Sequence, residues 1–250
     1  QKMLLHRLSL LSYQHELEQC GYTVHYVTYR NGDTTSSILQ AIVDTGATKL
    51  HIVDTTDNYL ERRIQTICAQ KGVARVSYDS PLFILGKEDA MARFKKSGKF
   101  MKKFYEALRK DKDILMDGNK PTGDQWSFDS NNRSKLPKTI TLPDDIAWLE
   151  NDEIESAQQW LETIDSEQYG EAKVWIPYTR TAAKKFLHEF LSDRFEHFGT
   201  YEDAITTKHH RLFHSTLSPL INIGLISPTE VIDAAIEYAK NHSTPINSLE

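Results

Sequence analysis

The sequence predicts an α/β fold class at the start of the chain and an all-α fold class at its end. Helix and strand patterns alternate with short turns up to residue 78, as in an open, doubly wound parallel sheet. Beyond residue 148 every periodic pattern is helical. We therefore expect an α/β domain over residues 1–85, a helical and irregular interdomain linker over 86–148, and an incomplete helical domain over 149–250.

The α/β part opens with a helix. Apolar positions at helical spacing predict a helix over residues 3–20, which Gly21 ends, and the β-rich run TVHYVTY predicts a strand over 23–29. The patterns that follow predict a helix over 36–46, a strand over 49–54, a helix over 57–72 with Asp57 as N-cap and Gly72 at its end, and a strand over 73–78. Because such a sheet normally opens with a strand, we expect at least one N-terminal strand to be missing. The ending TPINSLE suggests truncation there too.

The linker and the helical part follow from composition and capping signals. Helices are expected around 88–95 and 98–110, and then a long run rich in Gly, Pro, Asn and Asp predicts a connection up to residue 148. The helical part contains patterns for helices over 152–164, over 179–198 with Thr179 as cap and Gly199 at the end, and over 227–242, where Ser227, Pro228 and Glu230 form a capping box.

Composition limits the class of protein. The chain has 250 residues, of which 39% are hydrophobic and 26% charged, as in a globular protein, and no run approaches the roughly 18 apolar residues of a membrane span. Two cysteines, Cys20 and Cys68, can neither build a metal cage alone nor a disulfide framework, so we expect ordinary core cysteines and a cytoplasmic location.

Charge is distributed unevenly along the chain. The net charge of −5 argues against an indiscriminate nucleic-acid binder, yet residues 93–112 contain nine Lys and Arg against two acidic residues. A solvated face is the favoured interpretation of this run, and a phosphate-facing patch is the alternative. The run KHHR at 208–211 has the same two interpretations. Its adjacent histidines would point about 100° apart on a helix, which makes them poor joint metal ligands.

Several aromatic residues have structural and functional interpretations. Trp126 and Phe128 are expected to pin the linker to the domains, with help from Asp129 and Arg133, rather than to face a lesion or chromophore. The tryptophans at 148, 160 and 175 invite an electron-transfer interpretation, but the neighbours of Trp160 place it on an amphipathic face, and we assign none of the three to a relay.

The run LFHSTLSPLINIGLISP, residues 212–228, contains hydroxyl side chains and two prolines within an otherwise apolar stretch. Buried hydroxyls need hydrogen-bond partners, and a ligand can provide them. Residues alone leave two interpretations open. The run is either two helix caps in series around a kink or a segment that wraps a bound molecule.

The same run carries a resemblance to the photolyase/cryptochrome family. The family pattern Thr-Ser-x-Leu-Ser-Pro-Tyr-Leu-x-x-Gly-x-x-Ser is matched at Ser215, Leu217, Ser218, Pro219, Gly224 and Ser227, with departures at His214, Leu220 and Ile221. These departures, with GDQWSFDSNNR, FMKKFYEALRK and FGTYEDAI, resemble the iron–sulfur bacterial cryptochrome and photolyase branch, the deoxyribodipyrimidine photolyase-related proteins. The similarity extends from the first helix to Glu250.

The resemblance implies cofactors and a site. In the family this segment wraps the pyrophosphate and ribityl part of FAD, which implies flavin contacts at Tyr201, His214, Ser215, Leu217, Ser218 and Asn222. It also implies a 4Fe-4S cluster with ligands beyond Glu250 and an antenna, 6,7-dimethyl-8-ribityllumazine, in the α/β domain. No metal ligand and no catalytic residue is assigned within this chain.

The function implied by the resemblance is light-dependent repair of UV-damaged DNA. The favoured activity is that of a (6-4) pyrimidine photoproduct photolyase, a carbon–carbon lyase in which photoexcited reduced FAD passes an electron to a flipped-out lesion. A cryptochrome-type blue-light photoreceptor without repair is the alternative, as is an inactive fragment. We expect a monomer that binds DNA and no membrane.

Overall fold

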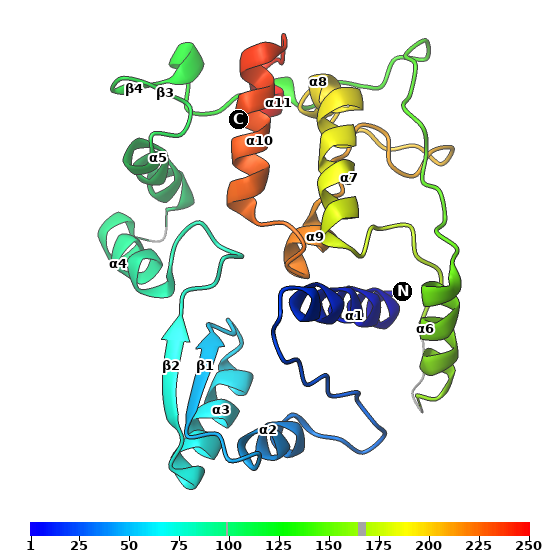
Figure 1. Ribbon diagram of the computed structural model, residues 1–250. Helices are drawn as coiled ribbons and strands as arrows, with labels where there is room; N and C mark the ends of the chain where they lie inside the picture. The colour runs from blue at the N-terminus through cyan, green and yellow to red at the C-terminus, as the bar shows by residue number, and fades with distance from the viewer. Residues whose placement is uncertain (99, 165–168) are drawn as a thin grey trace.

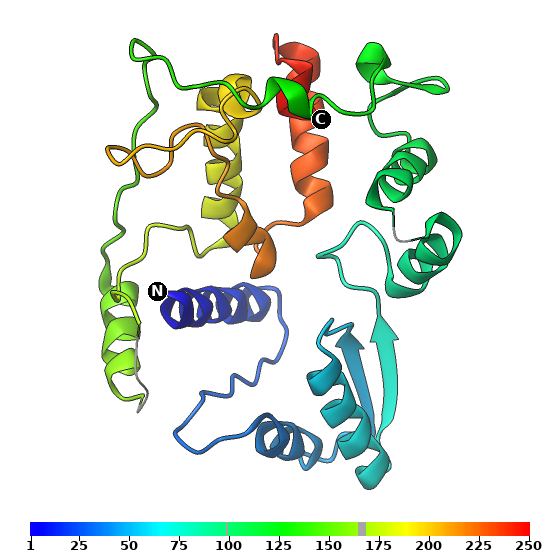
Figure 2. The ribbon, with the colours of Figure 1, turned by 180° about the vertical axis from the view of Figure 1, so that it is seen from behind.

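The computed structural model describes residues 1–98, 100–164 and 169–250. These residues form a mixed α/β structure, mostly helical, with a small parallel sheet. Figures 1 and 2 show the sheet and its helices at one end, the long helices α7 and α10 at the other, and the first helix between them. Among the described helices, none is both long and apolar enough to cross a membrane.

The sheet pairs two of the expected strands. β1 (Lys49–Val53) and β2 (Ala74–Tyr78) run parallel, with Lys49 opposite Ala74 and Val53 opposite Tyr78. Helices α2 (Thr35–Val43) and α3 (Asn58–Lys71) pack beside them. As expected, Asp57 caps α3 and Gly72 ends it in the left-handed conformation. The core of this region is small and consists of Val43, Ile64, Ile67, Cys68 and Val73.

The expected strand over 23–29 is wrong. The segment is not assigned to any strand, although Val24, Tyr26 and Thr28 are half-buried and alternate with exposed residues. A strand needs a neighbouring strand for its backbone hydrogen bonds, and in the described part of the chain β1 and β2 pair only with each other. The β-rich composition therefore produces an extended chain without a ladder.

Helix α1 (Lys2–Gln19) packs on α6 (Asp152–Glu162) rather than on the sheet. The shared core consists of Leu4, Leu8, Ile154, Ala157, Val174 and Tyr178. The guanidinium of Arg7 lies 4.4 Å from the ring centroid of Trp160 at the same interface. Helix α1 thus joins the first part of the chain to the helix that follows the linker. Cys68 is buried as expected, whereas Cys20, at the end of α1, is exposed and is not a core residue.

The linker contains α4 (Lys87–Ser97), α5 (Met101–Lys112) and a hairpin of β3 (Met116–Asp117) and β4 (Lys120–Pro121) that the composition did not predict. Single 3-10 turns follow at Thr122–Asp124 and Asp129–Asn131. Phe128 is buried, and its amide donates to the Glu250 carboxylate at 3.2 Å. Trp126 lies under Arg109 and Lys110. Phe128 thus pins the linker to the helical region, as expected, whereas Trp126 packs on α5 within the linker itself.

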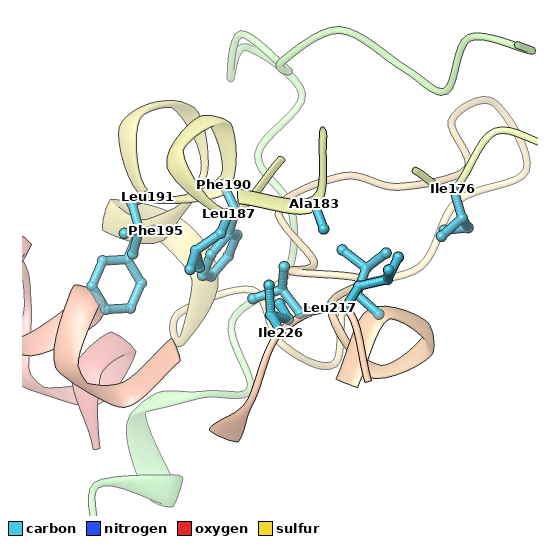
Figure 3. Close-up of a cluster of buried hydrophobic side chains, with 10 residues drawn as sticks. Ile176, Ala183, Leu187, Phe190, Leu191, Phe195, Leu217 and Ile226 are labelled. Atoms are coloured by element: carbon cyan, nitrogen blue, oxygen red, sulfur yellow. The ribbon is translucent and has the colours of Figure 1, made fainter. Parts of the chain in front are cut away.

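The helical region is built on α7 (Arg180–Asp193), α8 (Phe195–Phe198), α9 (Ser218–Asn222), α10 (Pro228–Asn241) and α11 (Ile246–Leu249). Figure 3 shows side chains of α7, of Phe195 and of the segment around Leu217 and Ile226 converging in the largest core of the described residues. Thr179 caps α7, and the capping box of Ser227 and Glu230 forms as expected.

The helix expected over 179–198 is divided, because Arg194 leaves the helical conformation with φ −129°. Gly199 does not end α8 through a left-handed turn either, since its φ of −63° is ordinary helical geometry. It is instead a close-packing position, where a Cβ would overlap the Asn247 carbonyl oxygen. The amide of Gly199 also donates to the Ser248 hydroxyl at 2.9 Å, so α11 docks on this glycine.

Candidate functional site

Residues 212–217 lie between two environments. On one side are two buried arginines, Arg194 and Arg211, and on the other is an apolar cavity to which Ser215 and Leu217 contribute. The segment reaches this position because it runs from the turn at 208–211 back across α7 into α9.

On the charged side, both guanidinium groups share Glu189 of α7. Arg211 donates to its carboxylate oxygens at 2.9 and 3.1 Å, and Arg194 donates to Oε1 at 3.2 Å. The side chains of Arg194 and Arg211 are 2% and 4% exposed, whereas that of Glu189 is 36% exposed, so solvent reaches these contacts from the side of the carboxylate. Burial and the charge of Arg194 lower the pKa of the Arg211 guanidinium, and Glu189 opposes that change.

The remaining guanidinium donors reach the backbone of the segment. Arg194 donates to the Leu212 carbonyl, and Arg211 donates to the carbonyls of His214 and Ser215, both at 3.3 Å. The interpretation of KHHR as a solvated turn is therefore wrong for Arg211. It is also wrong for His209, whose ring binds the Pro143 carbonyl at 2.9 Å and accepts from the Leu212 amide at 3.0 Å.

The end of the linker is clamped to this turn. His210 contacts the Asp145 carboxylate through both its amide, at 3.0 Å, and its ring, at 2.9 Å. Burial alone would raise the pKa of Asp145, but the hydrogen bonds from His210 and from the Ile146 amide lower it well below its ordinary value. Arg194 adds a hydrogen bond to the Asp144 carbonyl at 2.6 Å. The end of the linker is thus tied to the charged side of the segment, where Asp144, Asp145, Glu189, Arg194 and Arg211 line a cavity of about 730 Å³.

The backbone of the segment has an unusual conformation. Leu212 and Thr216 have φ of 49° and 52°, a left-handed region that bulky and β-branched residues rarely adopt. The amides of residues 213, 215, 216 and 217 have no hydrogen-bond acceptor within the described residues. Thr216 with positive φ precedes Leu217 at φ −80° and ψ −18°, and alternation of this kind brings successive amides together into a concave donor site.

The apolar cavity on the other side has a volume of about 360 Å³. Side chains of α5, α7, α8, α10 and α11 line it, among them Phe190, Phe195, Val231 and Ala235. A polar group borders it where the Tyr105 hydroxyl donates to Glu250 at 2.8 Å beside the buried Arg109. Burial and the Glu250 carboxylate raise the pKa of Tyr105. The cavity lies within the usual size range of small-molecule sites.

Comparison with known proteins supplies the family. The sequence profile of the deoxyribodipyrimidine photo-lyase-related proteins matches residues 1–175. The chain belongs to this family.

Individual relatives extend the comparison. The (6-4) photolyase of Agrobacterium fabrum is 24% identical over 242 residues, which cover 94% of this chain. The chain spans 48% of that relative, about half its length. The uncharacterized protein R852 of Acanthamoeba polyphaga mimivirus is 32% identical over 151 residues, covering 56% of this chain and 74% of R852. The uncharacterized protein R853 of the same virus is 43% identical over 51 residues.

Within this photolyase-related chain, the six residues expected to contact flavin do not line one cavity. Ser215 and Leu217 line the apolar cavity, and Leu217 is buried in the helical core. His214 and Tyr201 lie on the neighbouring turn, where the His214 ring faces the Ala204 carbonyl and Tyr201 packs against Phe213. Ser218 is exposed at the start of α9.

Asn222 lies farther away, at a second cavity of about 390 Å³ beside Gln1, Leu5 and Trp175. The structure therefore brings Ser215 and Leu217 together and keeps Asn222 apart from them. The flavin role of all six residues stays a prediction.

Sequence reasoning missed the buried arginines and Glu189. Arg211 was placed on a solvated turn, and Glu189 looked like one polar position on an amphipathic helix. The break at Arg194 carried no signal of its own, since no Gly or Pro precedes it. A possible signal was the sequence RLF, in which an arginine directly precedes two large apolar residues that need burial.

A further cavity of about 460 Å³ lies at the carboxyl ends of β1 and β2. Asp54, Asp57, Glu61 and Ser80 contribute polar atoms, and Phe83 and Leu85 contribute an apolar wall. Ligands of open α/β sheets bind at this edge. In the described part of the chain, no group of three or more His, Cys, Asp or Glu side chains is arranged to hold a metal ion.

Proposed function

We propose that this chain is part of a light-dependent DNA repair flavoprotein with (6-4) photolyase activity. The observation that carries the proposal is the segment 212–217, which lies beside an apolar cavity in a chain of the photolyase-related family. Its backbone is left-handed at Leu212 and Thr216, and four of its amides have no acceptor within the described residues. Strain of this kind persists where the surrounding structure enforces it, often at binding sites. The (6-4) photolyase of Agrobacterium fabrum, similar over 94% of this chain, supports the choice of activity.

The residues of the cavity fit a flavin dinucleotide in their chemistry. Apolar side chains such as Phe190, Phe195 and Val231 would exclude water from a planar ring, and the amides of residues 215–217 would donate to an anion. FAD, when bound, supplies a ring system that absorbs blue light and exchanges electrons. The role proposed for the chain is to orient that ring and to keep it dry.

DNA is the proposed partner, and the exposed lysines of α4 and α5 are the proposed contact. Arg93 is paired with Asp89 and Asp111, and Arg109 is buried, so neither is available. Lys95, Lys96 and Lys112 are exposed and, among the described residues, lack a carboxylate partner. Neutralising phosphates with such lysines would make binding fall steeply with salt. The solvated-face interpretation of residues 93–112 predicts no such dependence.

The antenna and the cluster remain predictions of the resemblance. We propose the cavity at the carboxyl ends of β1 and β2 for the lumazine, because the carboxylates of Asp54, Asp57 and Glu61 would accept hydrogen bonds from ribityl hydroxyls. The 4Fe-4S cluster, the doubly wound extension of the sheet and the cytoplasmic location are proposed on the same basis.

The deciding experiment combines flavin binding with repair. The protein containing this chain is reconstituted with FAD, reduced, and illuminated with DNA carrying either a (6-4) photoproduct or a cyclobutane dimer, with dark samples as controls. We expect a visible flavin spectrum and light-dependent loss of the (6-4) lesion. Flavin binding without repair of either lesion would favour the photoreceptor alternative, and absence of flavin binding would overturn the proposal.

A matched pair of variants tests the site. Ser215→Asp places a carboxylate beside the proposed anion-binding amides and should lower FAD affinity at least tenfold through like-charge repulsion. Ser243→Asp adds the same charge at an exposed position beyond α10 and should leave FAD affinity unchanged. Equal affinity of the two variants would contradict the placement of the site.

A further inference from the structure

The side chains of Arg194 and Arg211 are buried, and they share the partly exposed carboxylate of Glu189. Two guanidinium groups are costly to desolvate, and apolar side chains of similar volume often stabilise a core as well or better. The apolar surroundings are present, since the Arg211 guanidinium lies 4.1 Å from the ring centroid of Phe186. A group that is costly and structurally replaceable suggests a second role.

The direction of the guanidinium N–H donors of the two arginines indicates this second role. Three of the contacts from the two arginines go to the carbonyls of residues 212, 214 and 215, within one four-residue stretch. The peptide unit is planar and trans, so each carbonyl and the amide of the next residue point in opposite directions. Holding the carbonyls of 212, 214 and 215 toward the arginines therefore turns the amides of 213, 215 and 216 away from them.

The three amides identified by this geometry all lack a partner within the described residues, as does that of Leu217, whose preceding carbonyl the arginines do not contact. Within the described residues, the amides of 213, 215 and 216 have no acceptor, whereas the His214 amide, which the arginines do not turn, donates to the Arg211 carbonyl at 3.0 Å. The carbonyl contacts also span the stretch between the two left-handed residues, Leu212 and Thr216. External hydrogen bonds of this kind can maintain a conformation that the residues themselves disfavour.

We infer that Arg211, Arg194 and Glu189 are positioning residues that hold the backbone of residues 212–216 so that the amides of 215 and 216 are presented to the pyrophosphate of the flavin dinucleotide. This inference rests on the proposed function. Arg211 is the central member, because it binds two of the three carbonyls. Glu189 fixes both guanidinium groups and touches no ligand itself.

The inference can be tested with two flavins, FAD and riboflavin. They share the ring and the ribityl chain, and riboflavin lacks both the pyrophosphate and the adenosine of FAD. A variant that merely loosens the core should weaken both flavins together. A variant that misdirects the amides should weaken FAD and spare riboflavin.

The experiment measures dissociation constants for FAD and riboflavin by flavin fluorescence with wild type, Arg211→Lys, Glu189→Gln and Arg180→Lys. Lysine keeps the charge of Arg211 but cannot bind Glu189 and two carbonyls at once. We expect FAD affinity to fall about tenfold in Arg211→Lys and Glu189→Gln while riboflavin affinity changes less than about twofold. Arg180→Lys is the matched control, because Arg180 also lies on α7 and pairs with a glutamate, Glu230, at 2.7 Å without contacting the segment.

A second readout works without flavin. Backbone order parameters from nuclear magnetic resonance should fall for residues 213–216 in Arg211→Lys and stay unchanged in Arg180→Lys. If wild type binds neither flavin, the proposed function fails, and these order parameters still decide whether the arginines hold the segment. Unchanged order in Arg211→Lys, or an equal loss of both flavins, would overturn the inference.

Discussion

The helical region around α7 and the α/β region around β1 and β2 are held together differently. The helical region buries a continuous cluster from Ile176 to Ile226, and the side chains of Arg194 and Arg211 are buried beside it, although their partner Glu189 is partly exposed. The α/β region buries a smaller cluster around Ile64, and both members of its pair of Arg75 with Glu61 are partly exposed.

Both regions hold a left-handed threonine, Thr56 with φ 54° after β1 and Thr216 with φ 52° in the helical region. At Thr216, hydrogen bonds from buried guanidinium groups lie beside a packed core and can keep the surrounding backbone in place. Thr56 lies beside a two-stranded sheet, and small sheets of this kind depend on added packing for stability. The two threonines are therefore held by different surroundings.

The largest effect is expected from removing a fully buried side chain in each region. Leu220→Ala should lower the free energy of unfolding by about 2–5 kcal/mol, since Leu220 is 0% exposed and the tightly packed cluster around it cannot collapse into the cavity. Ile64→Ala should fall at the lower end of that range, because half-buried neighbours such as Leu39 and Leu60 can move in. Denaturant unfolding measures both, and a larger loss for Ile64→Ala would reverse the comparison.

Substitutions at two glycines test the effects of close packing and of backbone conformation on stability separately. Gly199→Ala should cost about 1–3 kcal/mol, because the new methyl group overlaps the Asn247 carbonyl although φ is ordinary. Gly72→Ala should cost about 1 kcal/mol, because φ is 67° although the space is open. Thermal unfolding of the two variants tests the order. A milder effect at Gly199 would mean that α11 shifts without loss of packing.

Substitutions at helix caps compare the stability of the two regions with the same kind of change in each. Ser227→Ala removes the capping box of α10 and Asp57→Ala removes the N-cap of α3, and each should cost about 1 kcal/mol. Thr229→Ala, at an exposed position in the first turn of α10, is the control and should change stability by less than about 0.5 kcal/mol. A negligible effect of Ser227→Ala would show that packing alone holds α10 in place.

Low pH should weaken the contact between the linker and His210, because it protonates Asp145. This is the smallest of the four predicted effects on stability. The folded pKa of Asp145 lies below its unfolded value, so its contribution to stability is complete above about pH 4 and is lost as pH falls through the folded pKa. Asp145→Asn should reduce this acid dependence. Asp44→Asn, in the exposed pair with Lys71 of the α/β region, should reduce it less, since solvent screens that pair. Thermal unfolding scans below about pH 5 compare them.

Local signals in the sequence predicted most of the secondary structure. Caps and glycine ends act over a few residues, which is why Asp57, Gly72, Thr179 and the Ser227 capping box are found where the pattern placed them. The family resemblance also depended on short motifs in order along the chain.

Long-range partners could not be predicted in this way. The run 23–29 has strand composition, but a ladder depends on a neighbour that is absent from the described structure. Helix α1 has apolar residues at helical spacing, and only the fold decides that it packs on α6. Arg211 looks like a surface residue until Glu189, 22 positions earlier, is brought against it.

By itself, the sequence determined most of the long helices and several of their caps, the strands β1 and β2, the irregular linker and the motif of residues 212–228. Only the tertiary structure decided that this motif lies between two buried arginines and an apolar cavity, and in which direction its amides point. The physical reason is the distance along the chain over which each interaction acts. Backbone propensities and caps depend on neighbours along the chain, whereas burial and the direction of a peptide group depend on residues that folding brings together.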